Sequence, residues 1–388
     1  MTDEPIDLLR AALPSPDPEA ALAIERPFLR DAAIEALRVA RAEPAWATPR
    51  LASHFREQKK LGSRDRKHVQ RAVFGVIRHE ALLRAAGFGA GLPELQGWAA
   101  LLQGARFSEL EAASPAAALA LALSLPEAIA GEWLAVLGPA EAAAFARRQT
   151  ERAPITLRAN RARCDRGALA ARLAAEGVQT HPVEGLPDAL EVEGGANLQP
   201  LASARAGWFE VQDRSSQAFV AAVAAHRPLA GRRLLDLCAG AGGKSLAFAA
   251  LGAQVWADDP RPAALRELQR RAARAGAAVS IGRPQARPEL VVVDVPCSGT
   301  GRLQREPALR YKLDVEPLLP VQAALLAEAA ATVAPGGLVA YATCSLMAAE
   351  NAPPAPPGLR LVDQALRWPH RVGGDGFGWA LYESVASK

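Results

Sequence analysis

Two cysteines and an aspartate stand where a sheet of parallel strands would carry its chemistry. Cys297 lies in the motif Asp294-Val-Pro-Cys-Ser-Gly-Thr-Gly301, and Cys344 lies in Ala342-Thr-Cys-Ser345. Each motif follows an apolar run that predicts a β-strand, so both thiols are expected at carboxyl ends of strands, where such sheets bind ligands. A thiolate in that position can act as a nucleophile. The sequence therefore offers Cys297 and Cys344 as candidate nucleophiles and Asp294 as their acidic neighbour.

The other two cysteines, Cys164 and Cys238, are expected to be inert residues that pack in the core. The four cysteines lack the close paired spacing of a zinc ligand set, so no metal is expected. Four cysteines in 388 residues are also too few for a disulfide scaffold. We therefore expect a protein of a reducing compartment, the cytoplasm.

A glycine-rich loop follows the first predicted strand of the same domain, in Asp236-Leu-Cys-Ala-Gly-Ala-Gly-Gly-Lys-Ser245. Glycines in this position let the backbone approach a ligand closely at a helix N-terminus. The loop is not a P-loop, because Cys238 stands five residues before Gly243, where that motif requires glycine. An acid after the next strand, Asp258 or Asp259, could hold ribose hydroxyls. A tight strand-to-helix turn without a ligand is the simpler alternative.

The elements that must position these residues alternate along the chain from Gly231 onward. Apolar runs predict strands at 234–237, 254–257, 290–295 and 338–343, and helical patterns lie at 244–250, 262–275 and 321–333. Such alternation predicts a doubly wound, mostly parallel α/β sheet. The proline-rich residues 353–358 are expected to form a stiff linker.

The chain before this sheet has a different character. Up to residue 150 its periodicity is helical throughout, including a pattern that begins near Ser63 and stops near Gly87, and this predicts an all-α bundle. Residues 151–212 predict a small α+β insert with strands at 154–158, 178–183 and 189–192 and a helix at 165–176. We therefore expect three domains, at 1–150, 151–212 and 213–388.

The charge is concentrated in the helical part. Residues 50–84 hold ten Lys/Arg against three Asp/Glu, a local charge of +7 in a chain of net +4. Arginine binds phosphate in bidentate fashion and stacks on bases, so this cluster favours a nucleic-acid partner. A solvated helix face that keeps the bundle soluble is the alternative. No apolar stretch is long enough to span a bilayer and no signal peptide is visible, so no membrane partner is expected.

Together, these motifs resemble the RsmB/Sun branch of the RNA 5-methylcytosine methyltransferases, relatives of the Nop2/Sun proteins. The resemblance rests on the glycine loop and on both cysteine motifs, the second followed by Glu350-Asn351. It also includes Gly207-Trp-Phe-Glu-Val-Gln-Asp213, Ser215-Ser-Gln217 and Asp375-Gly-Phe377, and it covers residues 151–388 almost continuously. The basic stretch Gly62–Arg78 is similar to the NusB-like helical domain of RsmB.

The resemblance implies a Rossmann-like, S-adenosylmethionine-dependent methyltransferase domain preceded by two RNA-binding regions. It assigns Cys344 as the nucleophile, Cys297 as the residue that assists product release, and Asp294 as a catalytic and cofactor-binding acid. Asp259 is assigned to the cofactor ribose. The remaining implied cofactor contacts are Cys238, Ala239, Gly240, Ala241, Gly242, Gly243 and Lys244. The candidate RNA contacts Arg64, Arg66, Lys67 and Arg71 come instead from the basic cluster of residues 50–84.

Cytosine chemistry explains the need for these residue types. Carbon C5 of cytosine is a poor nucleophile until a thiolate adds to C6, and C5 then attacks the methyl group of S-adenosylmethionine. A carboxyl group near N3 can offset the charge that develops on the ring. In DNA cytosine methyltransferases the Pro-Cys cysteine attacks instead, so Cys297 stays the alternative nucleophile.

We therefore expect a monomeric enzyme that methylates cytosine C5 in small-subunit (16S) ribosomal RNA. A tRNA or DNA cytosine methyltransferase, or an RNA-binding ribosome-assembly factor without turnover, is the alternative. Two departures from the family pattern motivate the last of these. Residues 280–284 lack the acid usually found near the adenine, and the region after Asn351 is shorter than usual.

Overall fold

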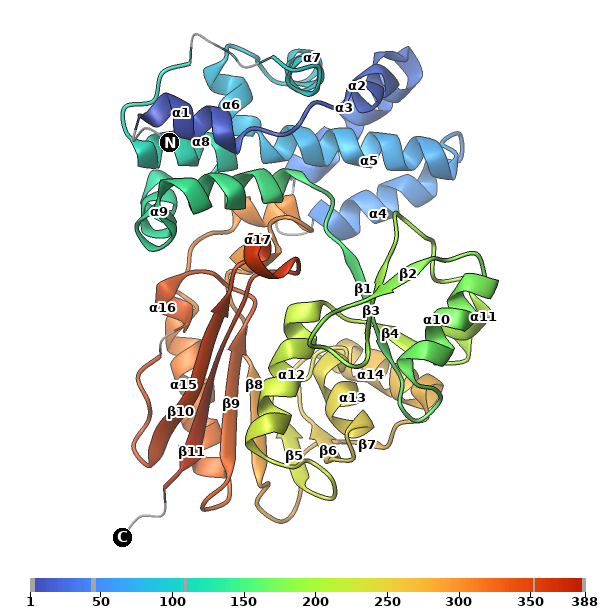
Figure 1. Cartoon of the computed structure of the whole chain (residues 1–388), viewed down its shortest axis with the longest axis vertical. Coiled ribbons are helices and arrows are strands. Elements are labelled where there is room, and N and C mark those ends of the chain that lie inside the picture. The colour runs from blue at the N-terminus through green and yellow to red at the C-terminus, as the bar shows by residue number, and fades with distance from the viewer. Residues whose placement is uncertain (1–3, 43–46, 106, 108–109, 352, 386–388) are drawn as a thin grey trace. The chain divides into compact units, whose positions relative to one another are not determined.

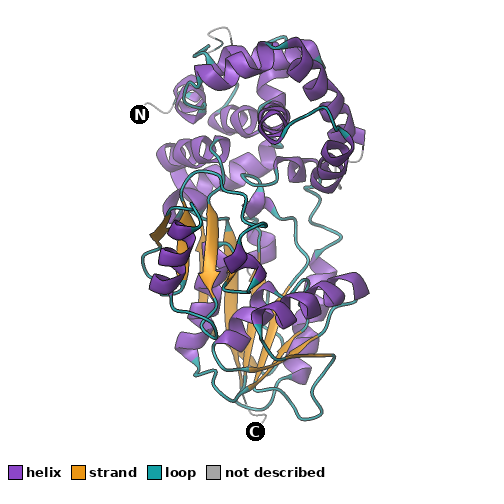
Figure 2. Ribbon diagram, turned by 90° about the vertical axis from the view of Figure 1, so that its right-hand side faces the viewer, coloured by secondary structure: helices purple, strands orange, loops and turns teal. Residues whose placement is uncertain are grey.

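The computed structural model describes residues 4–42, 47–105, 107, 110–351 and 353–385. The chain divides into two compact units (Figures 1 and 2). The first unit is Met1–Arg152 with Arg302–Leu313, and the second is Ala153–Gly301 with Asp314–Lys388. Along the chain, the boundary between the two units thus falls at residue 152. The segment 302–313, however, joins the helical unit although it follows the Cys297 motif directly.

The first unit is built of helices, as predicted. In chain order they are α1 (Pro5–Ala12), α2 (Pro18–Glu25), α3 (Pro27–Ala42), α4 (Ala47–Glu57), α5 (Ser63–Arg78), α6 (Glu80–Ala85), α7 (Leu92–Leu102), α8 (Pro115–Leu123) and α9 (Glu127–Thr150). Side chains cap the N-termini of α2 and α8. Asp17 accepts a hydrogen bond from the N–H of Ala20, and Ser114 accepts one from the N–H of Ala117, both at 3.0 Å. Among the described residues, no single helix is long and apolar enough to cross a membrane. The pair α8 and α9, bent by 112°, meets that criterion only together.

The predicted helix from Ser63 to Gly87 is two helices. Gly62 is the N-cap, its N–H bonded to Asp65, and Ser63 is the first helical residue. The chain leaves helical geometry at His79, between α5 and α6. Gly138, with φ of 70°, likewise breaks α9 in two.

In the core of the helical unit, the apolar face of α5 packs against neighbouring helices. Val69, Val73 and Ile77 are fully buried there, and Gly75 is required because a Cβ would lie 2.2 Å from the indole of Trp98. The short 3-10 helix η3 (Pro307–Tyr311) contributes Ala308 and Tyr311 to this core. The segment after the Cys297 motif is therefore an integral part of the helical unit.

The second unit begins with a small antiparallel sheet. Its elements are β1 (Ile155–Ala159), α10 (Arg166–Ala175), β2 (Thr180–Pro182), β3 (Ala189–Val192), α11 (Ala202–Arg205) and β4 (Phe209–Val211). The strand order is β2-β3-β1-β4, and each neighbouring pair is antiparallel. This βαββαβ order is the ferredoxin-like arrangement. The α+β insert predicted from sequence is therefore a complete ferredoxin-like subdomain.

The larger sheet carries the predicted chemistry. Its strands are β5 (Arg233–Asp236), β6 (Gln254–Ala257), β7 (Val279–Ile281), β8 (Leu290–Asp294), β9 (Leu338–Thr343), β10 (Leu359–Arg367) and β11 (Phe377–Ser384), in the order β10-β11-β9-β8-β5-β6-β7. The five strands from β5 to β9 are parallel, and β10 and β11 are antiparallel additions at one edge. The predicted mostly parallel sheet is confirmed.

Helices cover both faces of this sheet (Figure 2). The helices of the domain are α12 (Arg214–His226), α13 (Gly243–Ala250), α14 (Pro262–Ala275), α15 (Leu319–Thr332), α16 (Ala348–Asn351) and α17 (Pro369–Val372). On one face α12 and α13 pack on Leu234 and Val292, and on the other α15 packs on Leu235 and Val293. This alternation of adjacent residues is what a doubly wound sheet requires. Residues 353–358 lead from α16 to β10 without a helix.

The ferredoxin-like subdomain is joined to the sheet domain by buried polar contacts. Asn160 donates from Nδ2 to the carbonyls of Gly207 and Ala275, both at 2.8 Å, and Arg271 and Arg274 pair with the buried Glu210. Gly207 has a φ of 69°, and a Cβ there would lie 2.1 Å from the carbonyl oxygen of Arg274. Glycine is therefore required where these two parts meet.

We predict that Gly207→Ala lowers the free energy of unfolding by about 2–4 kcal/mol, from left-handed backbone strain and a backbone clash together. The matched control is Gly185→Ala, because Gly185 also has positive φ but has nothing within 4 Å of a Cβ. That variant should lose only about 1 kcal/mol. Urea denaturation of both measures the difference, and equal losses would show that the close approach has no energetic weight.

Candidate active site

Parallel pairing brings the two cysteine motifs to one edge of the sheet. Strands β8 and β9 are neighbours, with Asp294 opposite Ala342. Cys297 follows the end of β8 and Cys344 follows the end of β9, so the carboxyl ends of both strands deliver a thiol to the same place. The Sγ atoms of Cys297 and Cys344 lie 3.3 Å apart. Both side chains are half-buried.

The contact between the sulfurs affects the protonation of Cys297. The hydrogen bond with Cys344 and then burial raise the pKa of Cys297 well above its ordinary value. Cys297 therefore keeps its proton at neutral pH, and this protonated thiol lies beside the Cys344 sulfur.

An ion pair stands beside the cysteines. Lys244, the second residue of α13, places its Nζ 2.6 Å from Oδ2 of Asp294 and 5.0 Å from the centre of the Phe377 ring. Burial lowers the pKa of Lys244, but attraction to Asp294 and, to a smaller degree, to Cys344 outweighs burial, so the net pKa is raised. Lys244 is thus a cation held within electrostatic range of the Cys344 sulfur.

A buried carboxylate holds the Cys297 loop in place. Glu350 accepts from the N–H of Ser298 at 2.8 Å, from the Ser298 hydroxyl at 2.5 Å and from Nε2 of Gln322 at 2.9 Å. The same Nε2 donates to the carbonyl of Pro296 at 2.9 Å. The residues on either side of Cys297 are therefore tied to Glu350 and Gln322.

The Cys344 loop is tied to the same network. The hydroxyl of Ser345 lies 3.1 Å from those of Ser298 and Thr300, and Nδ2 of Asn351 donates to the Ser345 carbonyl at 2.9 Å. Further along the chain, Gly376 lies against Gly301 and its N–H donates to the Gly301 carbonyl at 2.8 Å. These contacts tie the backbones of the two cysteine loops to one network.

The glycine loop lies between β5 and α13 of the same sheet. Gly240 and Gly242 have positive φ, and a Cβ on Gly242 would meet the side chain of Leu268 at 2.6 Å. Asp236, at the end of β5, accepts from the hydroxyl of Ser245 at 2.6 Å. The loop is therefore a tight turn that exposes backbone at the start of a helix. It also contains Cys238, whose pKa is raised to about 12 by burial and nearby carboxylates.

The two acids after β6 are both paired with arginine. Oδ2 of Asp258 accepts from Arg283 at 2.7 Å, and Arg283 occupies the region after β7 where the sequence lacks an acid. Asp259 accepts from the N–H of Gly240 at 2.8 Å and from Arg261 with both carboxylate oxygens. Its side chain is 1% exposed, against 70% for that of Arg261. A ligand would reach Asp259 only after Arg261 moves.

Two models of known families match this chain. Residues 223–355 match the model described as 16S rRNA methyltransferase RsmB/F, and residues 125–199 match the one described as Methyltr_RsmF/B-like, ferredoxin-like domain. The chain belongs to the RsmB/F methyltransferase family. Both cysteines of the site lie within the first match.

Individual relatives of this RsmB/F family member agree with the match. Ribosomal RNA small subunit methyltransferase B of Salmonella arizonae is 33% identical over 216 residues, 52% of this chain and 50% of that protein. The chain thus spans about half the length of the curated relatives it matches. The crystal structure of PH0851 aligns with a TM-score of 0.73 over 95% of this chain and 99% of its own, at 20% identity. NSun6 from Pyrococcus horikoshii with SFG aligns with a TM-score of 0.57 over 66% of this chain and 97% of its own, at 17% identity. At these identities the two structures show a shared fold.

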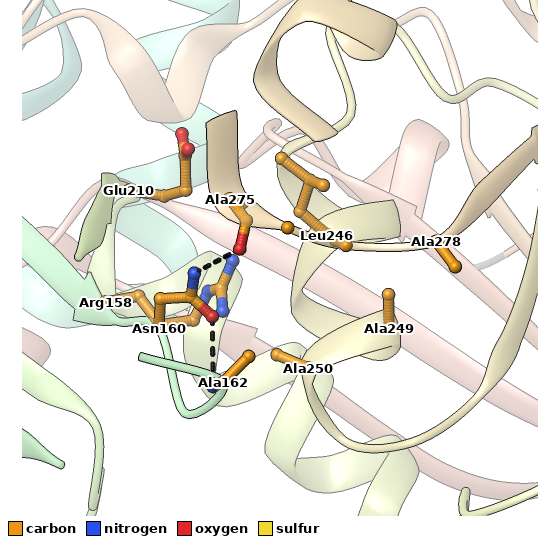
Figure 3. Close-up of a pocket in the computed structure, with 11 residues that line it drawn as sticks. Arg158, Asn160, Ala162, Glu210, Leu246, Ala249, Ala250, Ala275 and Ala278 are labelled. Carbon is orange, nitrogen blue, oxygen red and sulfur yellow. Dashed lines mark hydrogen bonds between the residues drawn. The ribbon is translucent and has the colours of Figure 1, made fainter. Parts of the chain in front are cut away.

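A cavity of about 110 Å³ lies away from this RsmB/F site, against the ferredoxin-like subdomain (Figure 3). Arg158 and Asn160 from that subdomain line it on one side, and Ala249, Ala275 and Ala278 line it on the other. None of the residues predicted to act is among its lining. Cys164, in the same subdomain, lies 3.5 Å from the carbonyl of Trp208 and is not part of the active-site edge.

The four basic residues predicted to bind RNA separate into two pairs on α5. Arg66 donates to the carbonyls of Leu61 and Gln58, and Arg71 pairs with Asp17. Arg64 and Lys67 are exposed, and within the described part of the chain no side-chain hydrogen bond or ion pair engages them. The structure thus leaves Arg64 and Lys67 as the pair available to a partner.

Sequence reasoning missed the residues that position the cysteines. Gln322 is a polar residue in the apolar run predicted as a helix, and that exception was the available signal. Glu350 stands out in the sequence only as part of a family motif, and its burial could not be inferred from its neighbours. Nothing in the sequence pattern singles out Arg261, although it stands two residues after the acid that it covers.

Burial gives Asp236 a pH-dependent effect on stability. Desolvation raises its pKa to about 6 from an ordinary 3.8, against the opposing hydrogen bond from Ser245. The folded chain therefore binds this proton more tightly than the unfolded chain, so Asp236 lowers the free energy of unfolding as pH rises from about 4 to about 6. We predict that Asp236→Asn, which cannot titrate, gains stability relative to the wild type over this range, by up to about 3 kcal/mol.

Urea denaturation of both proteins at pH 4, 5, 6 and 7 measures this difference. The conservative variant Ser245→Ala, which removes the hydrogen bond but keeps the carboxyl group, should steepen the wild-type dependence. Parallel profiles for the wild type and Asp236→Asn would contradict the prediction.

Proposed function

We propose that this chain is an S-adenosylmethionine-dependent methyltransferase of cytosine C5 in RNA, with small-subunit (16S) ribosomal RNA as its substrate. The observation that carries the proposal is the pair of thiols, 3.3 Å apart, beside the Lys244–Asp294 ion pair. Methylation of C5 needs a nucleophile for C6, a group near the ring and a means of releasing the enzyme, and this edge of the sheet holds candidates for all three. The name of the Salmonella arizonae relative supports the substrate.

Cys344 acts as the nucleophile in this proposal. Its thiolate adds to C6 of the cytosine, and the electron pair of the C5–C6 bond becomes available at C5 to take the methyl group. Lys244 favours the thiolate because its cation lies within electrostatic range of the sulfur. The proton on C5 then leaves to a base, its electron pair restores the C5–C6 double bond, and the C6–S bond breaks, which frees Cys344.

Asp294 and Cys297 assist at different stages. In this proposal Asp294 faces the base ring, where its carboxyl group offsets charge that develops near N3. Cys297 keeps its proton next to the departing sulfur, so it can support release of Cys344 as the C6–S bond breaks. Neither residue competes with Cys344 for the attack.

The loop 238–244 fits S-adenosylmethionine, which supplies an activated methyl group. Its positive-φ glycines bring backbone N–H groups to a helix N-terminus, and Asp259 and Asp294 provide carboxylates at either end. Arg261 must swing off Asp259 before that acid can hold ribose hydroxyls, and its 70% exposed side chain is free to do so. NSun6 with SFG, an analogue of this cofactor, supports the assignment.

The helical unit and the ferredoxin-like subdomain hold the RNA in this proposal, the former as a NusB-like domain. Each chain carries both cysteines, so a monomer suffices. The enzyme would work in the cytoplasm, where ribosomal RNA is available.

We predict that Cys344→Ala abolishes methyl transfer from labelled S-adenosylmethionine to RNA, while cofactor affinity changes less than about twofold, because the thiol touches the base. Cys297→Ala should instead accumulate an RNA–protein adduct that survives a denaturing gel, and the double variant should not. The matched control is Cys164→Ala, which lies outside the site and should behave as the wild type.

Ribosomal RNA from cells that lack the enzyme, tRNA and DNA are offered in parallel. Transfer to tRNA or DNA alone would contradict the ribosomal substrate. Turnover by Cys344→Ala, with an adduct formed through Cys297, would reverse the roles of the two cysteines.

We predict that RNA affinity depends on Arg64 and Lys67 more than on Arg66 and Arg71. Arg64→Gln/Lys67→Gln should weaken binding and flatten the slope of log K against log salt, by about 0.7 for each phosphate that the variant no longer neutralises. Arg66→Gln should mainly destabilise the turn before α5, whose carbonyls it holds.

The matched control is Arg10→Gln/Arg38→Gln, which removes the same charge from exposed helices of the same unit. Filter binding across a salt series provides the slopes. Equal slopes for the two double variants would show that the basic face of α5 only solubilises the bundle.

A further inference from the structure

The two active-site sulfurs are close enough to react with each other. Their 3.3 Å separation exceeds the length of a disulfide bond, about 2.05 Å, by little more than an ångström. Neither cysteine is in a disulfide, and both stand in loops rather than within strands. A methyl transfer that uses one thiol as nucleophile does not require the two sulfurs to react with each other. Disulfide formation would therefore be a separate reaction of this pair.

We propose that Cys297 and Cys344 form a peroxide-sensitive dithiol, in which a hydroperoxide oxidises Cys344 and Cys297 converts the product to a disulfide that closes the site reversibly. This inference rests on the geometry of the sulfurs and not on the identity of the methyl acceptor.

The chemistry takes place in two balanced steps. The Cys344 thiolate attacks one oxygen of hydrogen peroxide, the O–O bond breaks, and after proton uptake the products are a Cys344 sulfenic acid and water. The Cys297 sulfur then attacks the Cys344 sulfur, the S–O bond breaks, and the thiol proton leaves with the hydroxyl group as water. Overall two thiols and one peroxide become one disulfide and two molecules of water. The thiols are oxidised by two electrons and the peroxide is reduced.

The surroundings assign the two roles. Lys244 favours the thiolate at Cys344, and thiolates are the form that peroxides oxidise. Cys297 retains its proton and so resists direct attack, yet it stands next to the sulfur that becomes oxidised. Cys238 also stays protonated, because burial and carboxylates raise its pKa to about 12. One reactive thiol with an adjacent resolving thiol is the arrangement of a redox-sensitive pair.

The loops allow the short approach that the bond needs. Gly299 follows Cys297 by two residues with a φ of 72°, and both cysteine side chains are half-buried rather than enclosed. The Glu350 network holds the residues that flank the cysteines through their backbone and hydroxyl groups, and none of these contacts engages a sulfur atom. A disulfide would remove the nucleophile and the resolving thiol together, and a dithiol reductant would restore both.

The test treats the reduced full-length chain with hydrogen peroxide at neutral pH, blocks remaining thiols with an alkylating reagent, and measures intact mass and cross-linked peptides. We expect the loss of two hydrogens, a peptide that joins Cys297 to Cys344, two alkylated thiols remaining of the four, and full reversal by dithiothreitol. The Cys164→Ser variant should give the same disulfide at the same rate.

The Cys297→Ser variant distinguishes the two steps. With no resolving thiol, Cys344 should accumulate a sulfenic acid that dimedone traps, and should then proceed to the sulfinic acid, which dithiothreitol does not reverse. Dimedone trapping at Cys344 in the wild type with no cross-linked peptide would overturn the proposal, as would a disulfide that includes Cys238 or no oxidation of Cys344. Because every readout is a mass, the result stands whether or not the chain methylates RNA.

Discussion

The geometry of the active site depends on the hydrogen bonds to the carboxylate of Glu350. It is fully buried, and it accepts hydrogen bonds from Ser298 and Gln322 at the carboxyl edge of the sheet. Ser298 follows Cys297 directly, and its hydroxyl also contacts the hydroxyl of Ser345, which follows Cys344. A buried carboxylate is costly to desolvate unless donors surround it, so these loops cannot separate without leaving the charge unpaired. The close approach of the two cysteine loops follows from that constraint.

Much of this site could be predicted from sequence because its chemistry sits at strand ends. Apolar runs located β8 and β9, parallel pairing then implied that Cys297 and Cys344 meet, and the structure brings them together. The ferredoxin-like subdomain was seen only as a small α+β insert, because its last strand, β4, has three residues and gives too short a pattern. The roles of Glu350 and Gln322 depend on contacts between segments that are far apart in the chain, and no local periodicity encodes them.

Many arginines of this chain form ion pairs or hydrogen bonds within the protein, which the composition alone does not reveal. The four arginines Arg261, Arg283, Arg271 and Arg274 each bind a carboxylate of the second unit, and Arg66 binds backbone carbonyls of the first. The planar guanidinium can bind a carboxylate through two nitrogens at once, which the lysine ammonium cannot do. A count of basic residues therefore overstates the charge that a nucleic acid would meet. Within the +7 stretch 50–84, Arg64 and Lys67 on α5 and Arg56, Lys59 and Lys60 before it are exposed, whereas Arg66 and Arg71 are engaged.

The path of the chain has a topological consequence. After Gly301 the polypeptide leaves the sheet domain, packs η3 into the helical core through Ala308 and Tyr311, and returns at Asp314. The two units are thus joined by three covalent crossings rather than one hinge. A cut near residue 152 would not liberate the helical unit, because part of its core would stay attached to the other fragment. The helical unit is thus made of two separate stretches of sequence, and the second of them begins one residue after the motif that contains Cys297.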